Sequence, residues 1–349
     1  MELSFRIVDI IHETPDTKSF YLEHVGGTII SCLPGQFLTF IFQDAGHEVR
    51  RSYSLGSAPG VDKYLYITVK RKPNGSISRR LFEHYKTGDL LTAIEPSGKF
   101  IIDEPISTRY IFIAAGSGIT PIFSIIKHLL YFHDNATVLL INQSRNEENI
   151  IYNIQLEQLR QKFSSRFTVK QLFSQPVSHE YFSQRLNNML VETLIKQQVS
   201  QYNISELQCY ICGPQLFMLM AQFTLKLLHF KDHQIHKEQF VITPPPPAPL
   251  IAGTSAKKIV VHYKRKEYRI NAAYPTTILD AALQRGIPLP YSCKAGICST
   301  CMATCTKGEI LMSNNEVLTE KDISAGKVLT CTGYAVTDAE IWVGDMTEI

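Results

Sequence analysis

Four cysteines near the end of the chain have the spacing of an iron–sulfur site. Cys293, Cys298, Cys301 and Cys331 follow the pattern C-x4-C-x2-C-x29-C. With this spacing one tight loop supplies three thiolates and a distant strand supplies the fourth, as in one class of [2Fe–2S] cluster. Gly296 allows the loop to turn close to the sulfur atoms, where backbone N–H groups can donate hydrogen bonds. The pattern predicts a [2Fe–2S] centre.

A four-cysteine zinc site is the alternative for the same residues. Structural zinc sites usually contain two C-x2-C pairs, and only Cys298 and Cys301 have that spacing here. Four of the eight cysteines lie within residues 293–305, which favours metal ligation in a reducing compartment over a set of disulfides. Cys305 lies outside the ligand pattern and is expected to be a small buried residue or a spare thiol.

A second group with chemical potential is Arg51-Ser52-Tyr53-Ser54, at the end of an expected strand. A flavin needs a cation for its pyrophosphate, an aromatic face for its ring system and a hydroxyl group near N5, where hydride arrives. Arg51, Tyr53 and Ser54 could fill these roles in that order. A strand with one aromatic side chain packed inward would contain the same residues, so their surroundings matter.

The surroundings contain further features of a flavin site. Phe37 ends Pro34-Gly35-Gln36-Phe37 upstream, and Val69-Lys70 ends a strand-like run downstream. The segment Asn74-Gly75-Ser76-Ile77-Ser78 then opens a helix, whose first N–H groups suit a phosphate.

A glycine-containing loop follows an apolar strand farther along the chain. Gly116-Ser117-Gly118-Ile119-Thr120-Pro121 starts a helix with proline in its first turn, the geometry for phosphate at a helix N-terminus. The loop departs from the fingerprint G-x-G-x-x-G, so a standard NAD domain is not indicated. Ser144-Arg145, after the next strand, could bind a 2′-phosphate, which favours NADPH over NADH.

The elements around these motifs indicate several domains. Short strand-like runs separated by Pro-Gly, Asn-Gly and Ser-Gly turns predict an antiparallel β-barrel over residues 1–102. Apolar runs alternating with helical patterns predict an α/β domain with a parallel sheet over residues 103–242. The prolines at 244–247 and 249 predict an extended linker over residues 243–256. Residues 257–349 begin with a hairpin pattern at 257–270 and a short helix at 277–285.

The expected strands and helices have these ranges. Strands are expected at 36–42, 50–54, 64–70, 90–95, 110–114, 137–141, 167–173 and 208–211, and helices at 120–132, 152–162 and 215–229. His229, His233 and His236 approach ligand spacing, but they follow the end of the last helix and are expected in a solvated turn.

Composition excludes some classes of function. A formal net charge of +3 and a pI near 8.3 are too mild to indicate nucleic acid or an anionic membrane as a partner. The most apolar stretch, residues 110–132, is interrupted by Gly116, Gly118 and Pro121, so no membrane insertion is expected. The N-terminal segment lacks the pattern of a signal peptide, which favours the cytoplasm.

The motifs in this order resemble the ferredoxin–NADP⁺ reductase superfamily, and residues 257–349 resemble a plant-type ferredoxin, which implies an α+β β-grasp fold. The resemblance implies a flavin site that includes Phe37, Val69, Lys70 and residues 75–78. It also implies that Thr120 lies near the contact of flavin and nicotinamide.

Two further segments match the superfamily. Cys212-Gly213-Pro214 would lie beside the nicotinamide, and Glu238-Gln239-Phe240 resembles an acidic–x–aromatic ending in which Phe240 covers the flavin edge; an ordinary edge strand is the alternative. Ser54, Thr120, Cys212 and Glu238 would then surround the reacting atoms. Cys209 and Cys212 could instead form a redox dithiol, but residues three apart on a strand point to opposite faces. Against NADPH, Gln175 stands where many NADP-dependent relatives have arginine.

The domain order resembles the reductase components of bacterial oxygenase systems, that of phenylacetyl-CoA epoxidase in particular. The resemblance implies electron transfer from NAD(P)H to FAD, then to the [2Fe–2S] cluster and on to an oxygenase or hydroxylase. Aromatic-ring, alkane and lipid hydroxylases are other possible acceptors. A redox-sensing binding protein and a self-contained flavin enzyme are the alternative classes.

Overall fold

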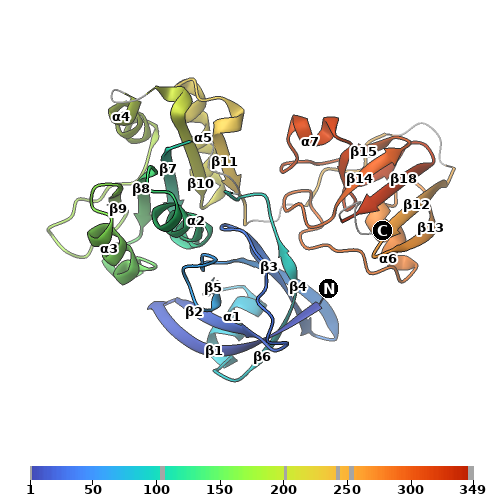
Figure 1. Cartoon of the computed structure of the whole chain (residues 1–349), viewed down its shortest axis with the longest axis horizontal. Coiled ribbons are helices and arrows are strands. Elements are labelled where there is room, and N and C mark those ends of the chain that lie inside the picture. The colour runs from blue at the N-terminus through green and yellow to red at the C-terminus, as the bar shows by residue number, and fades with distance from the viewer. Residues whose placement is uncertain (1, 103–106, 200–202, 241–243, 251–254, 345–349) are drawn as a thin grey trace. The chain divides into compact units, whose positions relative to one another are not determined.

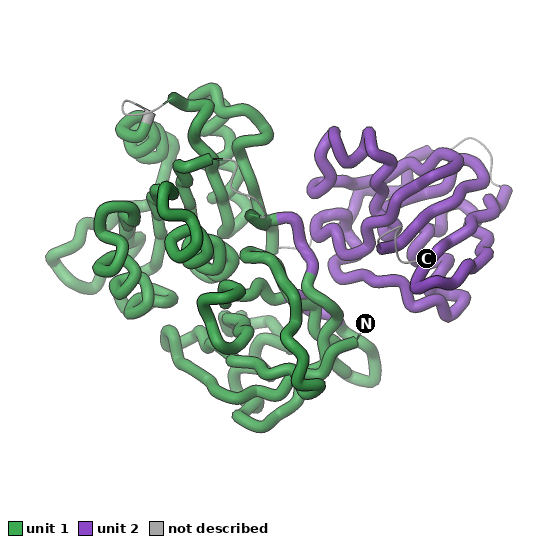
Figure 2. Tube along the Cα trace, in the orientation of Figure 1, with its two compact units in different colours: residues 1–49, 53–96, 100–241 green, residues 50–52, 97–99, 242–349 purple. Residues whose placement is uncertain are grey.

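The computed structural model describes residues 2–102, 107–199, 203–240, 244–250 and 255–344. They divide into two compact units (Figure 2). One comprises residues 1–49, 53–96 and 100–241, and the other residues 50–52, 97–99 and 242–349. The described part of the proline-rich segment, residues 244–250, is neither helix nor strand, and the remainder of the expected linker except residues 255 and 256 lies outside the described residues.

The first sheet is an antiparallel barrel with strand order β4-β3-β6-β1-β2-β5 (Figure 1). Its strands are β1 (Glu2–Thr14), β2 (Thr17–His24), β3 (Phe37–Asp44), β4 (His47–Ser54), β5 (Leu65–Lys70) and β6 (Leu90–Ser97), and α1 (Ser76–His84) follows β5. An antiparallel bridge between Leu55 and Ile67 joins the two edges of the sheet and closes it. Alternate residues of β1, such as Phe5 and Ile7, are fully buried inside, as period-2 patterning requires.

The second sheet is parallel, with strand order β11-β10-β7-β8-β9. The strands are β7 (Arg109–Ala115), β8 (Thr137–Ser144), β9 (Phe167–Phe173), β10 (Leu207–Cys212) and β11 (Ile235–Glu238), and the helices are α2 (Ile119–Phe132), α3 (Asn153–Lys162), α4 (Asn188–Val199) and α5 (Gln215–Leu227). Separate apolar clusters cover its two faces, and β7, β8 and β10 are therefore nearly continuous buried runs. The strand order reverses between β7 and β10, where α/β sheets bind ligands.

The second unit is built on a mixed sheet with strand order β13-β12-β18-β14-β16, in which β12 and β18 are parallel. Its elements are β12 (Lys257–Tyr263), β13 (Lys266–Ala272), α6 (Ile278–Gln284), β14 (Met302–Lys307), β15 (Ile310–Met312), α7 (Glu320–Ser324), β16 (Lys327–Leu329), β17 (Gly333–Ala335) and β18 (Ala339–Val343). Helix α6 packs on one face, which is the β-grasp arrangement. On β18, the only tryptophan of the chain, Trp342, stacks on His262 with ring centroids 3.9 Å apart.

The structure differs from the sequence expectation around β11. His236 was expected in a solvated turn, but it lies in this strand and stacks on Tyr210 with ring centroids 4.2 Å apart. Its Nε2 lies 2.9 Å from Gln208 Oε1, and burial lowers its pKa to about 4. Strand pairing along the edge of the sheet therefore overrides the local helix-ending pattern. Helix α4 had no sequence expectation. No helix among the described residues is long and apolar enough to cross a membrane.

Candidate flavin, nucleotide and cluster sites

Three of the predicted catalytic residues meet where strands of the two domains end. Cys212 ends β10 and pairs in register with Glu238, the last residue of the neighbouring β11. Ser54 ends the barrel strand β4, and its Oγ donates a hydrogen bond to Glu238 Oε2 at 3.0 Å. This contact joins residues 184 positions apart in sequence. It brings the expected flavin strand to the carboxyl edge of the parallel sheet.

The environment of this contact is electrostatically unusual. Burial raises the pKa of Glu238 to about 8, although the hydrogen bond from Ser54 opposes the shift. Burial, and then the nearby Glu238, raise the pKa of the fully buried Cys212 thiol. Cys209 packs in the apolar cluster on the other face of the sheet, so the two cysteines point to opposite sides, as strand alternation predicts.

The loop that connects β7 to α2 lies against the same strand end. A side chain at Gly118 would place its Cβ 2.2 Å from the carbonyl oxygen of Cys212, so only glycine fits at this approach. Gly116 has a φ of +55°, in the left-handed region. Helix α2 then begins at Ile119 without a side-chain cap, which leaves its first N–H groups suited to an anion.

Thr120 is the fourth predicted catalytic residue, and Pro121 follows it in the first turn of α2. Both are buried, Thr120 with 2% of its surface exposed. Thr120 Oγ1 lies close enough to the Tyr152 hydroxyl group to lower the pKa of that tyrosine, but has no partner with good hydrogen-bond geometry among the described residues. A buried hydroxyl group of this kind fits a site completed by a ligand.

The predicted flavin residues on β4 and β3 lie at the end of the barrel. Arg51 and Ser52 are exposed on β4, and Tyr53 is half-buried against Phe40 with ring centroids 6.1 Å apart. Phe37 is buried at the start of β3. An exposed cation beside a half-buried aromatic ring fits the charged and apolar parts of a flavin nucleotide.

The downstream flavin residues present mainly backbone groups. Val69 and Ile77 point into the barrel core, and Lys70 forms an ion pair with Asp16 at 3.3 Å. Ser76 Oγ donates to Asp44 Oδ2 at 2.8 Å, and Ser78 Oγ donates to the carbonyl oxygen of Gly75 at 3.3 Å. We therefore expect Val69 and Ile77 to contact a flavin through main-chain atoms.

The candidate 2′-phosphate residues follow β8. Ser144 is buried, and the exposed Arg145 donates from Nε to Gln175 Oε1 at 2.8 Å. The two residues that pointed in opposite directions on NADPH preference are therefore direct partners. Phe240, two residues beyond β11, has 37% of its surface exposed.

The four cluster cysteines converge in the second unit. Hydrogen bonds from Cys298 and Cys331 lower the pKa of Cys293, and one from Cys331 lowers that of Cys301. No three His, Cys, Asp or Glu side chains of the described residues surround a single ion position, and the thiols instead approach one another in pairs. The backbone N–H of Ala295 also donates to Cys293 Sγ at 3.3 Å. Thiolates with amide donors around them fit a [2Fe–2S] cluster.

Asn314 holds the cysteine loop and was missed by sequence reasoning. Gly296 has a φ of +76°, and a Cβ there would lie 2.5 Å from the Asn314 carbonyl oxygen. Asn314 Nδ2 donates to the Ala295 carbonyl oxygen at 2.7 Å, and the Asn314 carbonyl oxygen accepts from Thr332 Oγ1 at 2.8 Å. Asn314 thus connects the loop to the segment carrying the fourth cysteine. The only sequence signal was an Asn pair in a turn-like segment.

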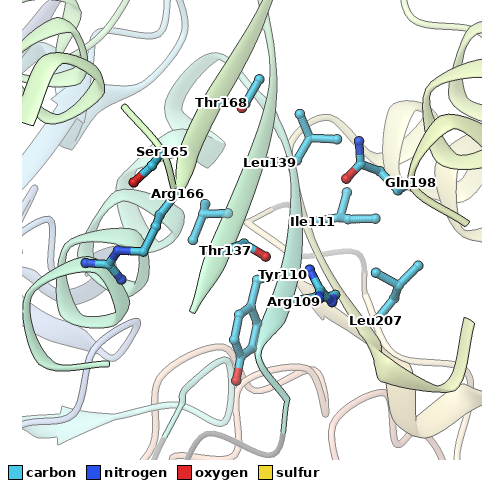
Figure 3. A pocket seen from close by; sticks show the side chains of 11 residues that line it. Arg109, Tyr110, Ile111, Thr137, Leu139, Ser165, Arg166, Thr168, Gln198 and Leu207 are labelled. Carbon is cyan, nitrogen blue, oxygen red and sulfur yellow. The ribbon is translucent and has the colours of Figure 1, made fainter. Parts of the chain in front are cut away.

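A cavity of about 180 Å³ lies away from these sites, at the amino-terminal edge of the parallel sheet (Figure 3). It is lined by Arg109, Tyr110, Ile111, Thr137, Val138, Leu139, Ser165, Arg166, Thr168, Gln198 and Leu207. The Arg166 guanidinium points away from Ile111 and Leu139 and donates to carbonyl oxygens of residues 130, 133 and 136. Dinucleotides bind at the carboxyl edge of such sheets, so this cavity is not the candidate site.

Three family matches cover most of the chain. Residues 4–102 match the oxidoreductase FAD-binding domain, residues 112–223 the oxidoreductase NAD-binding domain, and residues 261–336 the 2Fe-2S iron-sulfur cluster binding domain. These matches confirm the predicted FAD, NAD(P)H and [2Fe–2S] cofactors and favour the cluster over zinc at the four cysteines.

Two curated relatives are similar over nearly the whole chain. The ferredoxin reductase component of 3-ketosteroid-9-alpha-monooxygenase from Mycobacterium tuberculosis (strain CDC 1551 / Oshkosh) is 28% identical, covering 97% of this chain and 94% of the relative. The related component of 1,2-phenylacetyl-CoA epoxidase from Escherichia coli (strain K12) is 32% identical, covering 87% of this chain and 86% of the relative.

Solved structures have the same fold. Phthalate dioxygenase reductase superposes with a TM-score of 0.61 and 20% identity, over 99% of this chain and 98% of that one. An intact type IV self-sufficient cytochrome P450 monooxygenase superposes with a TM-score of 0.73 and 19% identity, over 98% of this chain and 41% of that one. The predicted multidomain fold is thus confirmed.

Proposed function

Because the chain belongs to the family of flavin- and [2Fe–2S]-containing reductase components of oxygenases, we propose that it supplies NADPH-derived electrons to a partner oxygenase or hydroxylase. Electrons pass from NAD(P)H to FAD and then to the [2Fe–2S] cluster. The observation that carries the proposal is the hydrogen bond from Ser54 to Glu238, which joins the flavin strand to the nicotinamide edge of the sheet.

The residues divide the work of binding and positioning. When bound, FAD accepts two electrons as hydride and releases them singly, as a cluster that carries one electron requires. Arg51 and Ser52, with the N–H groups of residues 75–78, bind the pyrophosphate, while Phe37, Tyr53, Val69 and Lys70 line the flavin site. Ser54 lies at N5. Residues 116–121 bind the nucleotide phosphates.

The remaining residues place the nicotinamide. Thr120 and Cys212-Gly213-Pro214 lie along the ring, and Phe240 covers the flavin edge until the nicotinamide displaces it. No side chain has to act as nucleophile, because hydride transfer depends on the distance and alignment of the two rings. The cluster is held by Cys293, Cys298, Cys301 and Cys331.

The proposed partner is phenylacetyl-CoA epoxidase, on the basis of the 32% identical relative. Steroid and glycine betaine monooxygenases, which name other relatives, are the competing acceptors. Residues 257–349 carry 11 Lys and Arg against 10 Asp and Glu, so docking depends more on shape and apolar contact than on charge steering. We further propose domains at 1–102, 103–242 and 257–349 with a linker at 243–256, and a cytoplasmic location that keeps the thiols reduced.

Anaerobic stopped-flow reduction tests this function. The FAD- and cluster-loaded chain is mixed separately with NADPH and NADH, and flavin and cluster absorbance are followed. Flavin bleaching followed by cluster bleaching, faster with NADPH, is expected. Flavin bleaching without cluster bleaching would contradict the electron path and favour a self-contained flavin enzyme, and no bleaching with either nucleotide would favour the redox-sensing alternative.

Replacement of Arg145 by alanine tests the nucleotide preference. We expect KM for NADPH to rise about 10- to 100-fold, since a hydrogen bond to a charged group is worth about 1.5–3 kcal/mol. KM for NADH should stay unchanged, because NADH lacks the 2′-phosphate. Arg160→Ala, which removes an exposed arginine paired with Glu157, is the matched control. An equal rise for both nucleotides would show that Arg145 does not bind the 2′-phosphate.

The pKa of Glu238 predicts a pH dependence of flavin reduction. Below about pH 8 the carboxyl group is protonated and neutral, and above it the group is negative. Since hydride brings negative charge toward Ser54, the rate constant should fall about tenfold at high pH, equal to about 1.4 kcal/mol in the barrier. Glu238→Gln, which stays neutral, should remove this fall in stopped-flow measurements between pH 6.5 and 9.5. An unchanged profile in Glu238→Gln would assign the titration to another group.

A further inference from the structure

A closed ring of buried hydrogen bonds joins the barrel to the nucleotide domain. The Tyr152 hydroxyl group bonds to Thr68 Oγ1, which lies 2.7 Å from Ser19 Oγ. Ser19 Oγ donates to Glu13 Oε1 at 2.6 Å, and the backbone N–H of Tyr152 donates to Glu13 Oε2 at 3.3 Å. The ring thus returns to the residue where it began. Strands β1, β2 and β5 supply three members, and only Tyr152 comes from the nucleotide domain.

Tyr152 is held in a conformation that few tyrosines adopt. Its φ is +63°, in the left-handed region, immediately before α3. A residue with a Cβ loses stability there, so the surrounding contacts must compensate. The fully buried ring stacks on Phe123 of α2 with centroids 4.5 Å apart, and meets Tyr66 of the barrel edge-on. A strained residue fixed from several sides points to a constraint beyond packing.

The Tyr152 hydroxyl group lies between the two halves of the proposed hydride-transfer site. A Cβ on Gly56, two residues after Ser54, would lie 2.6 Å from the hydroxyl oxygen. On the other side lies the buried Thr120 Oγ1, close enough to affect the tyrosine pKa. Burial raises that pKa far above its usual value, so the hydroxyl group keeps its proton and remains a donor.

We propose that Tyr152 is a positioning residue that fixes Thr120 relative to the flavin strand, and with it the distance from nicotinamide to flavin. This inference rests on the function proposed above. Tyr152 itself touches neither reacting atom and transfers no proton. Glu13, Ser19 and Thr68 anchor it from the barrel, so that the nucleotide loop follows the barrel rather than moving separately. Rate losses from small misplacements of reacting groups are large, which gives such an anchor a kinetic role.

Tyr152→Phe tests the proposal because it removes one oxygen and keeps the ring. We expect the limiting rate constant of flavin reduction to fall about tenfold, with less than a twofold change in the NADPH concentration giving half the maximal rate. Thr68→Val, which breaks the ring of hydrogen bonds from the barrel side, should produce the same split, and Thr68→Ser should restore the rate. FAD content and melting temperature are measured on each variant.

The outcomes separate this inference from the proposed function. If the wild-type chain is not reduced by NADPH or NADH, the proposed function itself fails. If the wild type is reduced and both Tyr152→Phe and Thr68→Val keep its limiting rate, only the positioning role is overturned. A rate loss that follows loss of FAD or of melting temperature, and that Thr68→Ser does not restore, would likewise reduce Tyr152 to a packing residue.

Discussion

Replacing Cys293 with serine is expected to abolish electron delivery to a one-electron protein acceptor while the flavin remains reducible by NADPH. Cys293 is the sulfur on which the other thiols converge, through hydrogen bonds from Cys298 and Cys331. Serine cannot supply the thiolate that a [2Fe–2S] cluster requires. Absorbance and electron paramagnetic resonance should show no cluster, whereas ferricyanide reduction, which needs only the flavin, should continue.

Cys305→Ser is the matched control for this experiment. Cys305 lies in the same unit on β14, half-buried, with its thiol donating to the Lys307 carbonyl oxygen rather than meeting the cluster cysteines. It should keep the cluster and full acceptor reduction. Retention of a cluster in Cys293→Ser, or its loss in Cys305→Ser, would show that the ligand set is wrong.

Replacing Ser54 with alanine is expected to slow flavin reduction about 100-fold, the usual cost of removing one positioned donor from a reaction centre. Ser54 is 6% exposed and donates to Glu238, so its hydroxyl group is fixed by contacts across the domain interface. The loss should appear in the limiting rate constant rather than in KM, because the hydroxyl group acts at the site of hydride arrival.

The control for Ser54→Ala is Ser165→Ala, an exposed serine lining the cavity at the opposite edge of the parallel sheet. It should leave the rate of flavin reduction unchanged. Ser54→Thr keeps a hydroxyl group and should recover part of the lost rate. If Ser54→Ala raises KM alone, Ser54 contributes to nucleotide binding and not to hydride transfer.

Local signals predicted most of the fold and the cluster. The cysteine loop lies within a few residues of chain, so spacing and Gly296 suffice to identify it, and strand 167–173 was predicted with the bounds that the structure has. Strand β11 was missed because its pairing with β10 is a tertiary contact that overrides the pattern of a helix ending at the preceding residues.

Contacts between distant residues could not be predicted from local patterns. The hydrogen bond between Ser54 and Glu238 joins two domains, and the sequence indicated each residue only separately. Tyr152 was recognised only as the start of a helix, since its positive φ and its partners on three barrel strands depend on packing. Val69 and Ile77 matched a flavin motif by type, whereas their burial in the barrel core followed only from strand and helix orientation.

Trp342, stacked on His262 in β18, gives the C-terminal unit a built-in fluorophore. Because the chain has no other tryptophan, excitation near the red edge of the band selects this one position in the whole chain. Emission in a denaturant titration would therefore follow melting of the iron–sulfur fold alone, while flavin release reports on the barrel. The two curves would coincide if the chain unfolds as one cooperative body and separate if its parts melt independently.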